Sequence, residues 1–216
     1  LGVENPWRNP LAWLRIMKSG VGLLLLPNHY PNLLVLEVGS GVPGDLAQIL
    51  KIATPDVVVV TRLPEISVHV EAYASPEAVQ KEEFSPAYAL RASAPLIIPA
   101  DDAYALDNAM RTGARVITYG SASEATVRIS NVGFYEEKGR VVGMQATAHI
   151  ADEKENIVVK GSVGRTQLFA TAAAVATAHS FHIPLDAASA SLLTYEPPPG
   201  RGRLFRGKND SIIIDD

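Results

Sequence analysis

Short apolar runs alternate with longer, more polar segments through the first 120 residues of the chain. Four apolar runs are at residues 33–38, 57–61, 96–98 and 116–119. Near-continuous apolar runs are typical of parallel strands that are covered on both faces. Helical composition marks the segments between them, at residues 43–52, 76–90 and 104–111. Ser75 followed by Pro76 and Glu77 is the clearest helix start. The pattern predicts repeated β-α units.

The pattern changes between residues 125 and 162, where polar and apolar residues alternate over several stretches. Alternation of this kind, with a turn at Lys138 and Gly139, predicts antiparallel strands. Helices are expected at residues 167–181 and 185–193, and a last strand at 211–214. We therefore predict an α/β fold across residues 1–216: a mostly parallel sheet with helices on both faces, plus a small antiparallel side sheet.

Composition narrows the class of protein. With 216 residues, of which 47% are hydrophobic, the chain can bury a sizeable core. A net charge of −4 argues against nucleic-acid binding, which needs a basic surface. No apolar stretch reaches the roughly 18 residues of a membrane span. Cysteine is absent, which excludes disulfides and fits a cytoplasmic protein.

A glycine-rich turn follows the first apolar run, and this run carries one acid, Glu37. Gly39, Gly41 and Gly44 then lead into a helix start whose free N–H groups could face an anion. The spacing also matches the G-x-G-x-x-G turn of dinucleotide-binding folds. The acid that such folds place after the next strand is missing here, because the chain has Thr61 and Arg62. Phosphate binding, metal binding and simple helix-sheet packing all remain open.

Seven segments in order resemble the central domain of the Mur ligases over nearly the whole chain. They are YPNLLVLEVGSGVPGDL, PDVVVVT, HVEAYASPEAV, IIPADD, GSVGRTQLFATAAAVATA, PPPGRGRL and SIIIDD. Within this family the chain most resembles the ligases that add D-alanyl-D-alanine to a UDP-linked muramoyl tripeptide. The resemblance implies ATP and Mg²⁺ as cofactors, and a carboxylate that is activated as an acyl phosphate before the amine attacks.

The resemblance also implies parts that this chain does not contain. The family's phosphate-binding loop, G-x-x-x-x-G-K-S/T, would precede Leu1, and a C-terminal domain would follow Asp216. The near-match at residues 202–209 has Asn209 at the hydroxyl position and follows prolines, so we interpret it as coincidence. We therefore expect an excised central domain, monomeric, without turnover by itself.

The resemblance assigns three metal ligands. Glu37 and His69 match family residues that bind magnesium beside the ATP phosphates. Glu83 stands where the family commonly has a carbamylated lysine. Its carboxylate either replaces that carbamate or marks the loss of a second metal site. Glu82 and Glu83 could also be a solvated helix face.

The resemblance also assigns the nucleotide contacts. Gln167 matches a residue near the adenine, although Thr166 and Ala170 depart from the family pattern. Arg201 matches an arginine at the ATP phosphates, where a guanidinium can bind in a fork, and it is the expected catalytic residue. Asp216, or its neighbour Asp215, matches the acid near the ribose.

Two other classes of function remain open. A dinucleotide-binding oxidoreductase domain would use the glycine-rich turn. A diverged, non-catalytic scaffold domain would explain the substitutions at Glu83, Thr166 and Ala170.

Overall fold

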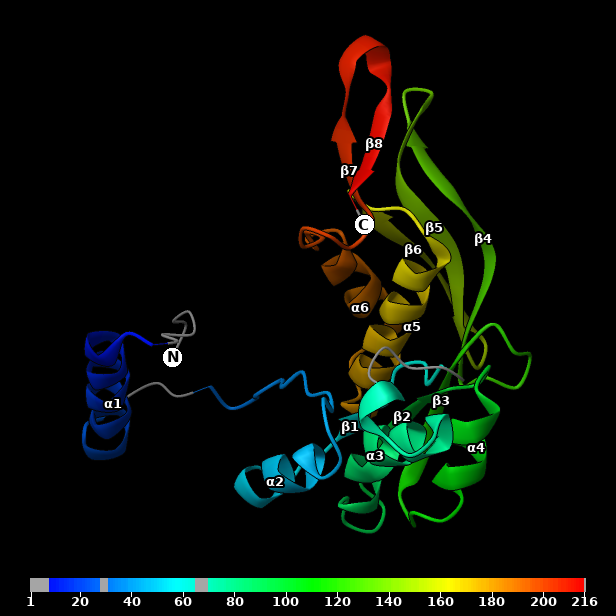
Figure 1. The fold of residues 1–216 in the computed structure, drawn as a ribbon. Helices are drawn as coiled ribbons and strands as arrows, with labels where there is room; N and C mark the ends of the chain where they lie inside the picture. The colour runs from blue at the N-terminus through cyan, green and yellow to red at the C-terminus, as the bar shows by residue number, and fades with distance from the viewer. Residues whose placement is uncertain (1–7, 28–30, 65–69, 216) are drawn as a thin grey trace. The chain divides into compact units, whose positions relative to one another are not determined.

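A six-stranded sheet with the order β1-β2-β3-β4-β5-β6 forms the centre of the chain in the computed structural model (Figure 1). The structure describes residues 8–27, 31–64 and 70–215. The strands are β1 Val58–Val59, β2 Pro95–Pro99, β3 Arg115–Gly120, β4 Val127–Glu137, β5 Arg140–Ile150 and β6 Glu153–Lys160. The pairs β1–β2, β2–β3 and β3–β4 are parallel, whereas β5 pairs antiparallel with both β4 and β6. The alternating segment thus continues the parallel strands within one sheet.

Helices and a second, small sheet complete the fold. The helices that follow the first glycine-rich turn are α2 Asp45–Ile52, α3 Pro76–Tyr88, α4 Ala103–Ala109, α5 Arg165–Ser180 and α6 Leu185–Leu192, with short 3-10 turns at Val70–Ala72 and Lys208–Asp210. The second sheet pairs β7 Arg203–Arg206 with β8 Ile212–Asp215 in antiparallel fashion. Within the described residues, no helix is long and apolar enough to cross a membrane.

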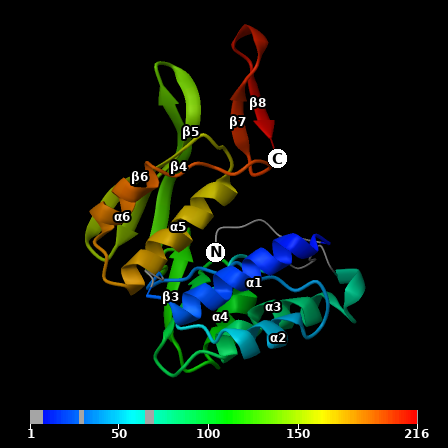
Figure 2. The same ribbon diagram turned by 90° about the vertical axis from the view of Figure 1, so that its left-hand side faces the viewer.

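Hydrophobic cores lie on both faces of the main sheet, as the apolar runs predict. In β2, Ile97 belongs to the core with α5 and α6, whereas Leu96 and Ile98 belong to the core with α3 and α4. Strand alternation sends neighbouring side chains to opposite faces. Figure 2 shows α5 lying along the sheet on one face. The predicted fold class, a mostly parallel sheet with helices and a small antiparallel sheet, is confirmed. The place of the small sheet differs from the prediction, because the strands between residues 125 and 162 extend the main sheet and the separate antiparallel sheet is β7–β8.

The predicted start of α3 is also confirmed. The Ser75 hydroxyl accepts a hydrogen bond from the backbone N–H of Ala78 at 3.3 Å, and Pro76 is the first helical residue. The same hydroxyl, with a backbone N–H, holds the pKa of the Glu77 carboxyl below its usual value. Local capping therefore decides where this helix begins.

The chain has two compact units, Leu1–Val38 and Gly39–Asp216, and each is described by itself. In the first unit, α1 runs from Pro10 to Leu25, and the side chain of Asn9 caps it by accepting from the N–H groups of Leu11 and Ala12. The apolar pattern did not predict this helix, although Asn9 and Pro10 are a recognisable helix start.

The predicted strand at residues 33–38 is wrong. In the described part of the chain this segment belongs to neither sheet, and its apolar side chains are exposed, with Val35 at 84%. A strand exists only through a hydrogen-bonded neighbour, and an apolar sequence does not supply one. Glu37 therefore lies on an extended, exposed segment rather than at the end of a strand.

Candidate nucleotide-binding site

Two predicted nucleotide-binding residues, 34 positions apart, meet at the start of α5. The side-chain amide of Gln167 donates a hydrogen bond to the backbone carbonyl of Arg201 at 2.8 Å. Gln167 is half-buried in the first turn of α5, and Arg201 is exposed in the loop before β7. No ion pair engages the Arg201 guanidinium within the described ranges of the chain. Its charged group is therefore available to a ligand.

Backbone contacts hold the Arg201 loop against the segment that leads into α5. Val163 donates its N–H to the carbonyl of Gly202 at 3.0 Å, and Leu204 donates to the carbonyl of Gly161 at 2.8 Å. Gly202 has a φ of 69°, and a Cβ there would lie 2.6 Å from the carbonyl oxygen of Val163. Only glycine permits this approach. The loop therefore has a defined position relative to Gln167.

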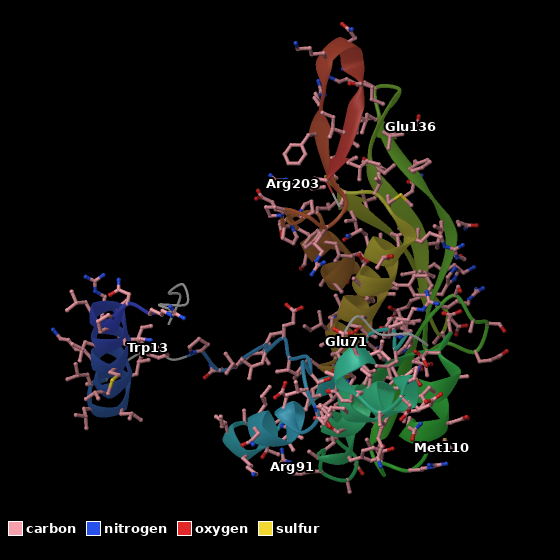
Figure 3. All side chains as sticks on the ribbon, viewed as in Figure 1. Trp13, Glu71, Arg91, Met110, Glu136 and Arg203 are labelled. Atoms are coloured by element: carbon pink, nitrogen blue, oxygen red, sulfur yellow. The ribbon has the colours of Figure 1, made fainter. Side chains whose placement is uncertain are left out.

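The acid at the end of β8 reaches the same loop. The Asp215 carboxylate accepts a hydrogen bond from the N–H of Gly200 at 2.9 Å. Its predicted partner Asp216 lies outside the described residues. We call Gln167, Arg201 and Asp215 the nucleotide corner. Figure 3 shows Arg203, which begins β7 two residues beyond Arg201, at the base of the hairpin.

The start of α5 suits an anion. Gly164 precedes the helix and offers no side chain as a cap, so the first N–H groups face outward with the positive end of the helix dipole. Ser162, fully buried just before the helix, has a hydroxyl without a hydrogen-bond partner among the described atoms. The outward N–H groups, together with the Arg201 guanidinium, could bind a phosphate or carboxylate, whereas the Ser162 hydroxyl is buried beneath the surface.

The glycine-rich turn before α2 does not offer free N–H groups, contrary to the sequence-based interpretation. The Asp45 carboxylate accepts from the N–H groups of Gly41 and Val42, both at 3.0 Å. Glu82 on α3 accepts from Gly44 at 3.0 Å and from Leu46 at 3.2 Å. The chain's own carboxylates thus occupy the turn. Glu82 is consequently a helix cap and not a solvated side chain, a pairing that no local signal in the sequence predicts.

The predicted metal ligands are distributed over the chain. Glu37 is exposed in the first unit, and Glu83 is half-buried on α3 in the second. His69 lies outside the described residues. Over the described ranges, no three His, Asp or Glu side chains gather in a group that could hold a metal ion. Their role as ligands stays a prediction.

Comparison with known families identifies the family of the chain. The sequence profile of the Mur ligase middle domain matches residues 21–178. The chain belongs to the Mur ligase family. No curated protein matches it significantly.

Solved structures share the fold of this Mur ligase domain. MurF from Acinetobacter baumannii has a TM-score of 0.72 at 15% identity, covering 84% of this chain and 38% of that one. MurF ligase from Thermotoga maritima, solved in complex with ADP, has a TM-score of 0.68 at 22% identity, covering 80% and 38%. A pseudomurein peptide ligase type C from Methanothermus fervidus has a TM-score of 0.60 at 16% identity. The match covers 88% of this chain and 47% of that one. The domain therefore spans less than half the length of these proteins.

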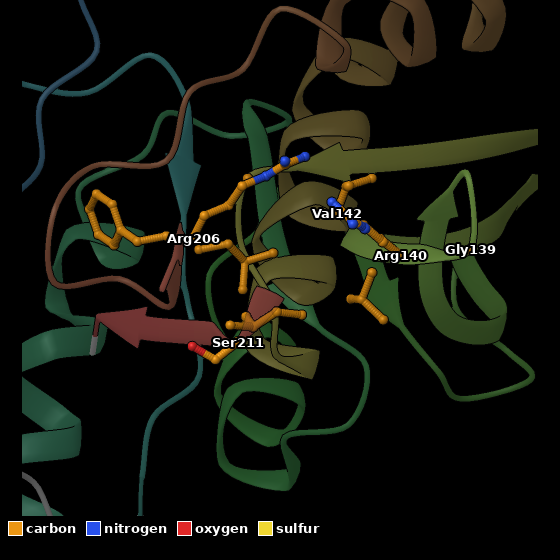
Figure 4. A pocket seen from close by; sticks show the side chains of 10 residues that line it. Gly139, Arg140, Val142, Arg206 and Ser211 are labelled. Atoms are coloured by element: carbon orange, nitrogen blue, oxygen red, sulfur yellow. The ribbon is translucent and has the colours of Figure 1, made fainter. Parts of the chain in front are cut away.

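A pocket in the Mur ligase domain adjoins the nucleotide corner. It lies between the start of β5 and the β7–β8 hairpin (Figure 4). Most of its lining is apolar, and the residues include Val141, Val142, Leu204, Phe205, Ile212 and the arginines Arg140 and Arg206. Gly161, whose carbonyl anchors Leu204, also lines it. An apolar recess beside a few polar groups is the kind of surface that small-molecule ligands use.

Proposed function

We propose that this chain is the central, ATP-binding domain of an ATP-dependent amide ligase of peptidoglycan precursor synthesis. The reaction would add D-alanyl-D-alanine to a UDP-linked muramoyl tripeptide through an acyl phosphate. Membership of the Mur ligase family supports this proposal, and so does a fold shared with MurF proteins, one of them solved with ADP.

The nucleotide corner carries the proposal. Gln167 and Asp215 hold the backbone of the 200–201 loop from two sides, through the Arg201 carbonyl and the Gly200 N–H. These bonds hold the Arg201 backbone beside the first turn of α5, whose cap position, Gly164, has no side chain. A planar guanidinium binds phosphate oxygens in a fork, and backbone N–H groups at a helix start add to this. Such an arrangement favours a nucleotide phosphate.

The residues of the corner have distinct proposed roles. Arg201 would bind the phosphates and stabilise the charge that develops as a phosphoryl group is transferred. This electrostatic stabilisation depends on hydrogen-bond donors that are already in position. Gln167 would position Arg201 and face the base, and Asp216 would accept from ribose hydroxyls beside Asp215. Positioning of this kind is most of what phosphoryl transfer requires from a protein.

Magnesium is the proposed companion of ATP. Glu37, His69 and Glu83 would hold it, and carboxylate oxygens are ligands that Mg²⁺ prefers. When bound, the ion would neutralise charge on the phosphates. The glutamate at position 83 would supply an anionic oxygen in place of a carbamylated lysine; the alternative is that the second metal site has been lost.

The filled glycine-rich turn argues against the alternative of a dinucleotide-binding oxidoreductase. Its N–H groups, which would bind a pyrophosphate in that fold, are bound by Asp45 and Glu82. The other alternative is a non-catalytic scaffold. A scaffold domain would bind no nucleotide, whereas the proposed ligase domain would bind ATP.

The test compares two arginines in the protein that carries this chain. Arg201→Gln should raise the KM for ATP about tenfold or more, because a lost charge-assisted hydrogen bond costs about 1.5–3 kcal/mol. Arg203→Gln, the matched control, should leave the KM unchanged. ATP-dependent ligation of D-alanyl-D-alanine to the UDP-linked tripeptide is the measurement. No ATP binding in the parent protein would contradict the proposal and favour the scaffold.

A further inference from the structure

Two cationic side chains and a histidine form a single row across β4, β5 and β6. The strand register places Arg128 opposite His149, and His149 opposite Lys154. Neighbouring strands are about 4.8 Å apart, so the row spans about 10 Å. We call these three residues the cation row.

A second row of neutral polar residues lies beside the cation row on the same face. Ser130 pairs with Thr147, and Thr147 pairs with Asn156. His149 Nε2 lies 2.7 Å from the Ser130 hydroxyl, which links the two rows. Residues two apart on a strand share a face, so both rows project from the same side of the sheet. The surface therefore offers cations next to hydroxyl and amide groups.

This face of β4, β5 and β6 is not covered by the helices that cover the rest of the sheet. Ile129 and Ala148, which lie between the members of the two rows on β4 and β5, are buried in the core with α5 and α6 on the opposite face, as is Ile157, which follows Asn156 on β6. The core beneath α3 and α4 draws its strand residues from β1 to β3 only. Arg128 and His149 are half-buried, and Lys154 is exposed. The cation row is thus open to solvent and lies on the other face of the sheet from α5.

The positive charge of the row is not neutralised by an ion pair in the described part of the chain. One acid, Asp101, lies over Gly120, the partner of Arg128 on β3. Its two carboxylate oxygens already accept from the N–H and hydroxyl of Ser121, both at 2.7 Å. Asp101 therefore lies at the β3 end of the cation row, where its oxygens already accept hydrogen bonds from Ser121 and form no ion pair with the row.

Two more acids flank the row in sequence. Glu153 and Glu155 alternate with Lys154 along β6 and project from the opposite face. They line a depression together with Pro184 and Asp186, which Lys154 also borders. Burial lowers the pKa of His149, and the charges of Arg128 and Lys154 lower it further. The cations thus repel a proton on His149, as unneutralised neighbours do.

We propose that the cation row binds a small multivalent anion of the phosphate type, such as a diphosphate or sugar phosphate, at a site separate from the nucleotide corner. Two cations about 10 Å apart, with an imidazole between them, match two adjacent anionic groups better than one. Ser130, Thr147 and Asn156 supply hydrogen bonds for the neutral polar atoms of such a ligand. An acidic chain that concentrates unpaired cations in one row gains electrostatic attraction for anions at that place.

Titration of the whole chain with inorganic diphosphate at low salt tests this site, because salt screens surface charges. Calorimetry gives the affinity, and NMR of the imidazole reports the pKa of His149. We expect saturable binding and a rise in that pKa, since an adjacent anion favours the imidazolium. Arg128→Gln should weaken binding about tenfold or more, and Lys154→Gln should weaken it as well. Because Lys154 is exposed, its variant keeps the test valid if Arg128→Gln fails to fold.

Controls separate this site from the nucleotide corner and from general charge. All titrations are repeated in the Arg201→Gln background, which removes the guanidinium proposed to bind phosphate at the nucleotide corner, and saturable binding should persist there. Lys51→Gln, which removes an exposed cation at the end of α2, should leave diphosphate affinity unchanged. Absence of saturable binding in the Arg201→Gln background would overturn the proposal. So would an equal loss in Lys51→Gln, or succinate binding as tightly as diphosphate, because a phosphate-type site discriminates against that dicarboxylate.

Discussion

At the scale of single residues, polar side chains in this domain act over long sequence distances. Glu82 caps a helix 38 residues before it through Gly44, and Gln167 holds the carbonyl of Arg201. Each satisfies a backbone group that would otherwise lack a partner near the surface. The charge on Glu82 also faces the positive end of α2, which adds to the cap.

Loss of the Glu82 carboxylate should destabilise the domain. We expect Glu82→Ala to lower the free energy of unfolding by about 1–2 kcal/mol, as for other lost helix caps, because the N–H groups of Gly44 and Leu46 lose their acceptor. Urea unfolding measures it. Lys81→Ala, exposed on the same helix, is the control and should differ little from the parent. Equal stability of the two variants would show that the cap contributes nothing.

The depressed pKa of His149 predicts a pH dependence of stability. The folded imidazole binds a proton less readily than the unfolded one, whose pKa is near 6.5. The unfolded chain therefore takes up more protons as the pH falls below that value, and stability declines until the folded imidazole is also protonated. Urea unfolding at a series of pH values should show this decline, and His149→Gln should reduce it. An identical pH profile in the variant would contradict the assignment.

At the scale of elements, the antiparallel strands depend on close backbone contact. Gly143 in β5 lies against β6, where a Cβ would be 2.1 Å from the carbonyl oxygen of Val159. Gly133 in β4 has no atom within 4 Å of the place where its Cβ would be. Gly143 is therefore required by close packing, whereas Gly133 has room for a side chain. Only the packing of the strands distinguishes the two glycines.

These glycines give a matched pair of substitutions. Gly143→Ala should destabilise the domain by about 1–3 kcal/mol, since an overpacked atom must displace the β5–β6 ladder. Gly133→Ala should be neutral or slightly stabilising, because alanine restricts the unfolded chain. Thermal unfolding of both variants measures the difference. A larger loss in Gly133→Ala would show that the strand contacts are assigned wrongly.

At the scale of the whole molecule, the domain spans 38% of the MurF chains that share its fold. Its two units contribute different candidate residues: Glu37 lies in the first, and the nucleotide corner lies in the second. Ligation as proposed needs both. The proposal for Glu37 is therefore testable only in the whole enzyme.

In the protein that carries this chain, Glu37→Ala should reduce ATP-dependent ligation by about 100-fold or more, as the loss of a group that stabilises transition-state charge does. The effect should fall mainly on kcat if the carboxylate acts through the metal during phosphoryl transfer. Glu136→Ala, an exposed acid on β4, is the control. Unchanged turnover in Glu37→Ala would remove this residue from the mechanism.

Much of the fold could be predicted from the sequence because its signals are local. Period-two and near-continuous apolar patterns correctly indicated β2, β3 and the antiparallel strands, and the Ser75 cap marked the start of α3. The predicted last strand at 211–214 is confirmed as β8, within one residue at each end. These features depend on side chains a few positions apart, so a single sequence contains them.

Only the tertiary structure decided which distant groups meet. The apolar run at 33–38 reads as a strand, yet it has no ladder partner in the described fold. The sequence of the glycine-rich turn suggests an anion site, yet the Glu82 carboxylate on α3 already accepts hydrogen bonds from its N–H groups. The contact between Gln167 and Arg201 and the alignment of the cation row likewise join separate elements. Strand register and helix packing set these pairings, and both arise from burial across the whole domain rather than from neighbouring residues.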